Sequence, residues 1–232
     1  QGLYPPEILA ALELPINMFY PLSPFEYFGK VNMLKVGIVY ADMITTVSER
    51  YAAEIQESNE YGCGLEGILR QRKGDVVGVL NGVDYGVWNP ASDKLIRAPY
   101  DQSNLEGKRA NKKALLEAFQ IPDPDLTRPV IGMVGRLVDQ KGFDIVLPLL
   151  PKLAAKDAYL VILGSGLPRY QEQLQALRKK YPRFLGVRIG YDNRLAHLVE
   201  AGSDMFLMPS RFEPCGLNQM YSLKYGTLPI VT

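Results

Sequence analysis

From Val130 to the end of the chain, short apolar runs alternate with longer segments of helical periodicity. The runs predict strands and the segments predict helices, because apolar positions recur every 3.6 residues on a half-buried helix. Strands that are apolar along their whole length are typical of a parallel sheet covered on both faces. We therefore expect an α/β fold here. The predicted strands are 130–134, 159–163, 186–190, 204–208 and 228–231, and the predicted helices are 143–156, 169–181, 193–201 and 216–225.

The pattern before Val130 is less regular. Residues 1–30 are rich in proline and aromatic residues without a clear period, and they predict loops and short helical turns. A β-α-α-β run follows, in which Ser48 is a good N-cap. Its elements are predicted as a helix at 32–40, a strand at 43–47, a helix at 49–58, a loop at 61–64, a helix at 65–72 and a strand at 76–80.

Two domains fit this division of the pattern. Asn81–Asp84 looks like a hinge, so we predict a first domain at 1–82 and a second at 83–232. Residues 85–107 are polar and contain proline, which favours a surface loop, with Trp88 and Pro90 as packing anchors. A helix at 108–119 leads into the second domain.

Composition excludes several classes of protein. With 47% hydrophobic and 22% charged residues, the 232-residue chain can bury a core. A formal net charge of +1 gives no electrostatic case for a nucleic-acid or membrane partner, and no apolar run is long enough to span a bilayer. Cys63 and Cys215 fit a reducing cytoplasm, and one histidine, His197, excludes a His-pair metal site within the chain.

The residues that could carry chemistry follow the predicted strands. Parallel strands end at one edge, where ligands bind, so the loops after them should gather along one rim. Arg136 and Lys141, five positions apart in a glycine-flanked loop, could hold a diphosphate, although a pair of solvated surface charges is the alternative. Glu213 lies between a strand and a helix start, where it could meet a ligand or simply favour the helix N-terminus.

Other residues on this rim give weaker signals. Gly164-Ser165-Gly166 could let the backbone approach a ligand. Tyr191 could stack on a base or could serve packing alone. His197 is better explained as a structural helix histidine than as a ligand. Cys215 has no histidine near it in the sequence, so a nucleophilic role is disfavoured.

Five stretches, in order, resemble the bacterial glycogen and starch synthases of glycosyltransferase family 5. They are YFGKVNMLKVGIVYADMITTVSERYAAEI, GCGLEGIL, VLNGVDYGVWNPASD, GRLVDQKGFD and PSRFEPCGLNQMYSLKYGTLP. The resemblance covers nearly the whole chain. It implies a GT-B fold, with two Rossmann-like parallel-sheet domains, both incomplete in this chain. It also implies a retaining enzyme that moves glucose from ADP-glucose to the non-reducing end of an α-1,4-glucan.

The resemblance further implies roles for individual residues. Arg136 and Lys141 would hold the donor diphosphate, and Glu213 would lie against the donor glucose. The second domain would bind the nucleotide sugar and the first would face the acceptor glucan. No cofactor beyond the donor and no metal is implied. The implied substrate-binding residues are Gly135, Gln140, Tyr191, Cys215, Gly216, Leu217 and Asn218.

Two positions depart from the pattern of related transferases. Asn218 stands where the family usually has threonine, and Tyr221 stands where many retaining relatives have a second glutamate. The family's active-site histidine and Lys-Thr-Gly-Gly loop would precede residue 1, so residues 1–232 alone are expected to be inactive. A GT-B transferase with another donor or acceptor, or a non-catalytic paralogue that binds glucan or nucleotide, are the alternatives. Oligomeric state is not indicated by the sequence.

Overall fold

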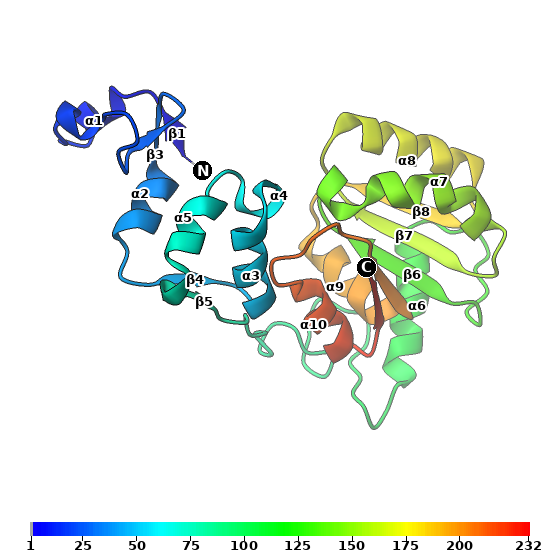
Figure 1. The fold of residues 1–232 in the computed structure, drawn as a ribbon. Helices are drawn as coiled ribbons and strands as arrows, with labels where there is room; N and C mark the ends of the chain where they lie inside the picture. The colour runs from blue at the N-terminus through cyan, green and yellow to red at the C-terminus, as the bar shows by residue number, and fades with distance from the viewer. Residues whose placement is uncertain (1) are drawn as a thin grey trace. The chain divides into compact units, whose positions relative to one another are not determined.

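The computed structural model describes residues 2–232, which form two compact units (Figure 1). One unit spans Gln1–Asn81 and the other spans Gly82–Thr232. The first holds a three-stranded and a two-stranded sheet, and the second is built on a five-stranded sheet. Among residues 2–232, no helix combines the length and the apolar character needed to cross a membrane.

The first unit opens with an antiparallel sheet that the sequence pattern did not predict. Strand β1 (Leu3–Tyr4) pairs with β3 (Lys30–Asn32), which also pairs with β2 (Glu26–Tyr27). Part of the loop expected over residues 1–30 is therefore corrected to short strands. Helix α1 (Ile8–Ala11) and a 3₁₀ turn (Ile16–Met18) confirm the short helical turns that were predicted there. Strands of two or three residues are too short to show a period.

The rest of the first unit follows the predicted β-α-α-β run. Strand β4 (Ile44–Thr46) pairs in parallel with β5 (Val76–Gly78), and Ser48 caps the helix after β4 by accepting a 3.0 Å hydrogen bond from the Tyr51 amide. A short helix, α4, replaces part of the loop predicted at 61–64. Helix α2 (Met33–Tyr40) precedes β4. Between β4 and β5 the helices are α3 (Glu49–Glu57), α4 (Asn59–Gly62) and α5 (Glu66–Gln71), and a 3₁₀ turn (Lys73–Asp75) precedes β5.

The second unit confirms the parallel α/β sheet. All its strand pairs are parallel, in the order β10-β9-β6-β7-β8. The strand bounds agree with the prediction to within one residue. They are β6 (Val130–Val134), β7 (Tyr159–Gly164), β8 (Leu185–Ile189), β9 (Met205–Met208) and β10 (Leu228–Val231).

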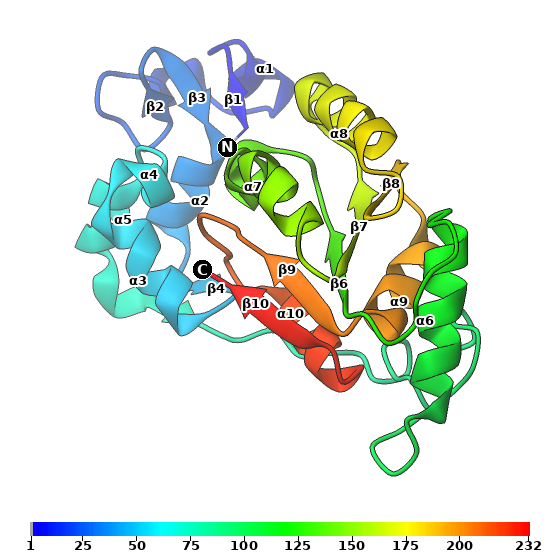
Figure 2. The ribbon, with the colours of Figure 1, turned by 90° about the vertical axis from the view of Figure 1, so that its right-hand side faces the viewer.

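Helices cover both faces of this sheet, as Figures 1 and 2 show. On one face α7 (Phe143–Ala154) and α8 (Pro168–Lys180) enclose a core around Phe143, Leu160 and Leu174. On the other, α6 (Glu106–Ala118) and α9 (Asn193–Gly202) enclose a second core. Helix α10 (Leu217–Lys224) joins β9 to β10. All strand carboxyl ends consequently lie at one edge.

The surface loop predicted at 85–107 is wrong for part of its length. Ile96 and Tyr100 are buried and pack with Ala201 and Tyr225, with Trp88 against the same cluster. Two hydrophobic residues in a polar segment give no periodic signal, so their burial was not predicted. The segment is an integral part of the second unit.

Candidate functional site

The candidate site lies where β6 and β9 end. The loop after β6 carries Lys141, and the loop after β9 carries Ser210 and Glu213. Side chains from both loops line a narrow cavity of about 20 Å³. The residues of interest around it are Gly135, Lys141, Ser210, Glu213 and Asn218. The fold therefore brings together residues that the sequence placed in separate loops.

Lys141 and Glu213 form an ion pair within this cavity. Their side chains keep 24% and 17% of their surface exposed, so the pair is only partly screened by water. Ser210 donates a hydrogen bond from its hydroxyl to the same carboxylate oxygen, Oε1, at 2.6 Å. Ser210 was not predicted as a site residue. Its position directly after an apolar strand, at the ligand edge, was a signal that could have identified it.

Arg136 is exposed to solvent and contacts Gln140. Its Nη2 donates to Gln140 Oε1 at 3.2 Å. Gln140 also joins the two loops, because its side-chain amide donates to the Phe212 carbonyl at 3.2 Å and its own carbonyl accepts from the Arg211 amide at 2.9 Å. Gln140 thus fixes the distance between the loop with the cations and the loop with Glu213.

Gly142 is required by this close approach of the two loops. Its φ is +70°, and a Cβ there would lie 1.9 Å from the Pro209 carbonyl oxygen. Only glycine combines that left-handed conformation with the absence of a side chain.

Gly164 and Gly166 serve the same loop rather than an open ligand surface. A Cβ on Gly164 would lie 2.0 Å from the Gly135 carbonyl oxygen, and one on Gly166 would lie 2.4 Å from that of Leu137. Leu137 donates from its amide to the Ser165 carbonyl at 2.9 Å. The prediction that these glycines admit a ligand is corrected, because the backbone that approaches them is the chain's own.

Helix α10 begins beside Glu213. Gly216 occupies its N-cap position in the left-handed conformation, with φ 75° and ψ 48°, and Cys215, Leu217 and Asn218 are half-buried around it. The first amides of a helix have no partner within the helix and carry a partial positive charge. This terminus can therefore attract an anion at the same edge as Lys141.

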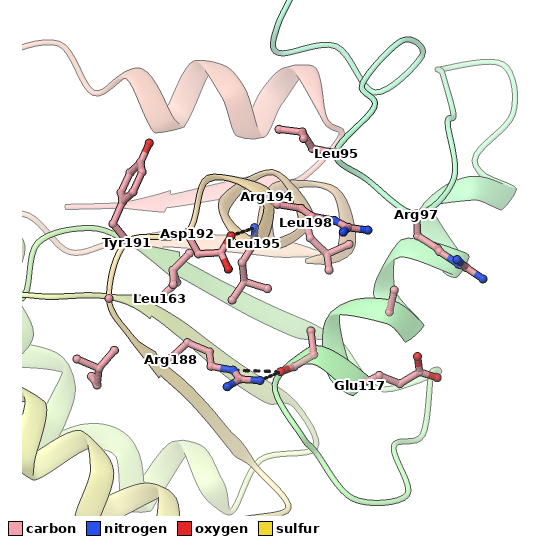
Figure 3. Close-up of a pocket in the computed structure, with 14 residues that line it drawn as sticks. Leu95, Arg97, Glu117, Leu163, Arg188, Tyr191, Asp192, Arg194, Leu195 and Leu198 are labelled. Atoms are coloured by element: carbon pink, nitrogen blue, oxygen red, sulfur yellow. Dashed lines mark hydrogen bonds between the residues drawn. The ribbon is translucent and has the colours of Figure 1, made fainter.

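A larger hollow, about 810 Å³, lies along the same edge between α6 and α9 (Figure 3). Tyr191 stands at its rim with 89% of its surface exposed, and stacking of this ring on a base stays a prediction. Asp192 caps α9 by accepting from the Leu195 amide at 2.9 Å. The apolar residues that line the hollow include Leu163, Leu195 and Leu198. The charged residues that line it include Arg97, Arg188 and Arg194.

His197 lies away from this edge in a buried cluster. Its Nδ1 is 2.8 Å from Asp93 Oδ2, and the two side chains are 1% and 2% exposed. Trp88 stacks on His197, at 3.8 Å between ring centroids, and on Tyr221, at 4.0 Å. This packing agrees with the prediction that His197 is a structural histidine and that Trp88 is a packing anchor. Cys215 is a free thiol, and within residues 2–232 no three His, Cys, Asp or Glu side chains cluster as a metal site would require.

Two family models match the chain. The model described as glycosyl transferases group 1 matches residues 116–232, and the model described as starch synthase catalytic domain matches residues 1–71.

Similar proteins extend these matches across the chain. A glycogen synthase of Koribacter versatilis is 54% identical over 231 residues, and glycogen synthase 2 of Nitrosococcus oceani is 50% identical over 230. These alignments cover 100% and 99% of this chain but 47% and 46% of the relatives, so the chain spans about half their length.

A solved structure agrees with these relatives. The catalytic domain of starch synthase IV from Arabidopsis thaliana, bound to ADP and acarbose, has a TM-score of 0.91 and 32% identity, covering 100% of this chain and 48% of that one. The likeness to this structure confirms the GT-B fold.

Proposed function

Because the chain belongs to the family of group 1 glycosyl transferases, we propose that the whole protein elongates an α-1,4-glucan with glucose from ADP-glucose. The α configuration is retained in the proposed reaction. Support comes from the glycogen synthases that match the entire chain and from the similar starch synthase, which was solved with ADP and acarbose. The proposal assigns no metal or cofactor and places the protein in the cytoplasm.

The observation that carries the proposal is the cluster of Lys141, Glu213 and Ser210 beside the first turn of α10. Transfer of a glucosyl group leaves negative charge on the departing diphosphate and positive charge on the sugar. A fixed cation, a helix N-terminus and a carboxylate at one point can stabilise both charges as they develop. The two opposite charges are already in contact before a donor arrives.

Lys141 and Arg136 act on the diphosphate. Lys141 is a compact point charge, and Arg136 offers a planar fork that matches two phosphate oxygens. Arg136 is exposed and contacts Gln140 at 3.2 Å, so little has to be broken before it binds a phosphate. The amides of Leu217 and Asn218 add the positive end of α10.

Glu213 acts on the sugar. Once the diphosphate pairs with Lys141, the Glu213 carboxylate faces the glucosyl group. Within this cluster it then keeps the hydrogen bond that it accepts from the Ser210 hydroxyl. A carboxylate in that position stabilises an oxocarbenium-like sugar by charge and orients it by hydrogen bonds. Tyr191, exposed at the rim of the larger hollow, stacks on the adenine.

The test uses the full-length protein with a maltooligosaccharide acceptor. We expect elongation with ADP-glucose, at a higher kcat/KM than with UDP-glucose, and a large loss in Arg136→Ala. Equal or better use of UDP-glucose would assign a different donor to the same fold. Absence of transfer from any nucleotide sugar, with nucleotide binding retained, would instead indicate a binding paralogue.

A further inference from the structure

A buried chain of polar groups connects α9 to the first turn of α10. The Glu200 carboxyl, on α9, is 1% exposed, and its Oε2 lies 2.8 Å from the Ser222 hydroxyl. The same hydroxyl lies 2.7 Å from the carbonyl of Asn218. Asn218 lines the cavity that holds Lys141 and Glu213, so this series of polar groups ends at the candidate site.

The number of hydrogens available decides in which protonation state of Glu200 both contacts of the Ser222 hydroxyl can be hydrogen bonds. A serine hydroxyl has one hydrogen to donate, and an ionised carboxylate can only accept. If Glu200 is ionised, the Ser222 hydrogen serves either Glu200 or the Asn218 carbonyl, but not both. If Glu200 carries a proton, it donates to Ser222, and Ser222 donates to Asn218. Both short contacts are hydrogen bonds only in the protonated form.

The surroundings of Glu200 also favour a proton on it. Its other oxygen, Oε1, is buried without a hydrogen-bond partner among the described residues, which would be costly for a full negative charge. The nearby cation does not compensate, because all three hydrogens of the Lys108 ammonium are engaged elsewhere. They are donated to the Ala201 carbonyl at 3.2 Å, the Tyr225 carbonyl at 3.0 Å and the Thr227 hydroxyl at 2.8 Å.

Burial raises the pKa of Glu200 to about 8, against the smaller opposing effects of the Ser222 hydrogen bond and the Lys108 charge. Burial also lowers the pKa of Lys108 to about 8, so both groups titrate in the same pH range. Glu200 also acts on three phenols, whose pKa values are raised, chiefly by burial. These are Tyr100 on the segment before α6, and Tyr221 and Tyr225 on and just after α10.

We propose that Glu200 is a positioning residue, which in its protonated form holds the first turn of α10 through Ser222 and Asn218 in the geometry that binds the donor diphosphate. Ionisation of Glu200 withdraws the Ser222 hydrogen from Asn218 and adds a negative charge behind the helix that receives the phosphates. Binding of ADP therefore weakens as Glu200 loses its proton. This inference rests on the proposed function, because it assumes that α10 meets the diphosphate.

The test measures the Kd of ADP for the full-length protein by calorimetry at pH 7 and pH 9. With a pKa of about 8, the protonated fraction falls from about nine-tenths to about one-tenth, so wild-type affinity should fall roughly tenfold. Glu200→Gln keeps a neutral donor to Ser222 at every pH and should remove most of this fall. Ser222→Ala cannot bond the Asn218 carbonyl and should therefore bind ADP more weakly than wild type already at pH 7.

Glu172→Gln, on the exposed surface of α8, is the matched control and should behave as wild type. Circular dichroism establishes that each variant is folded, and Glu200→Gln is close enough in shape to remain so. A wild-type Kd that does not change with pH overturns the inference, as does an equal fall in Glu200→Gln, which would assign the effect to Lys108. Failure of the wild type to bind ADP at either pH would instead refute the proposed function.

Discussion

Lys141 and Glu213 stand 72 positions apart in the chain, yet their charged groups are in contact at the carboxyl ends of two neighbouring strands. Each residue is delivered by its own loop, and Gln140 holds the two loops together. Before a donor binds, the pair neutralises its own charges. In the proposed reaction the donor separates the two side chains. Its diphosphate then pairs with the Lys141 ammonium, and its glucosyl group contacts the Glu213 carboxylate.

Replacing Lys141 by alanine should lower kcat/KM for ADP-glucose by about 10²–10³ in the full-length protein, because one electrostatic contact to the leaving group is lost. Glu213→Ala should cause a loss of similar size. The double variant should lose more than the product of the two, since each single variant also removes an ion pair that the donor would have to break. Steady-state kinetics of the four proteins measures this coupling.

Lys113→Ala is the control for removing one lysine. Its side chain is 65% exposed on α6 and lies 4.0 Å from Glu117, where a surface ion pair contributes little. We expect kcat/KM within twofold of wild type. A double variant that loses less than the product of the two single losses would contradict the idea that the donor separates Lys141 from Glu213.

Gly142→Ala should destabilise the protein and also reduce activity. The left-handed conformation alone costs about 1–2 kcal/mol for a residue with a Cβ, and this Cβ would also meet the Pro209 carbonyl. Gly226→Ala is the matched control, because its φ is +63° and nothing lies within 4 Å of an added Cβ. Urea unfolding midpoints should fall further for Gly142→Ala, and only that variant should lose transferase activity. Equal midpoints would show that the loops yield to the methyl group.

Asp93→Ala should strongly reduce stability. One carboxylate oxygen of Asp93, Oδ2, is 2.8 Å from His197 Nδ1 and accepts from the Tyr225 hydroxyl at 2.6 Å. Removing one partner of such a buried set leaves the others without their hydrogen bonds, which commonly costs about 1–3 kcal/mol for each group. Unfolding in denaturant measures the change in the free energy of unfolding of the second unit. Ser92→Ala, at an exposed position, is the control. A loss below about 1 kcal/mol would mean that water or a rearranged neighbour replaces the carboxylate.

Local pattern determined most of the second unit and the β-α-α-β run of the first. The strand at Val130–Val134 was predicted with the bounds that the structure has, and Ser48 was identified as the cap that it is. Periodicity, capping and continuous apolar strands are properties of neighbouring residues, so the sequence shows them directly. The β-α order then implied a single edge for Arg136, Lys141 and Glu213. Their roles in catalysis stay predictions.

Only the tertiary structure decided which distant groups meet. It paired Leu3 with Asn32, Asp93 with His197 and Glu200 with Ser222, and it turned Gly164 and Gly166 toward the chain's own loop instead of a ligand. None of these pairs has a periodic or local signature, because each depends on how separate elements pack after the chain has closed long loops. Lys141 and Glu213 show the division most clearly. The sequence placed each at a strand end, but the packing of neighbouring strands put their charges in contact.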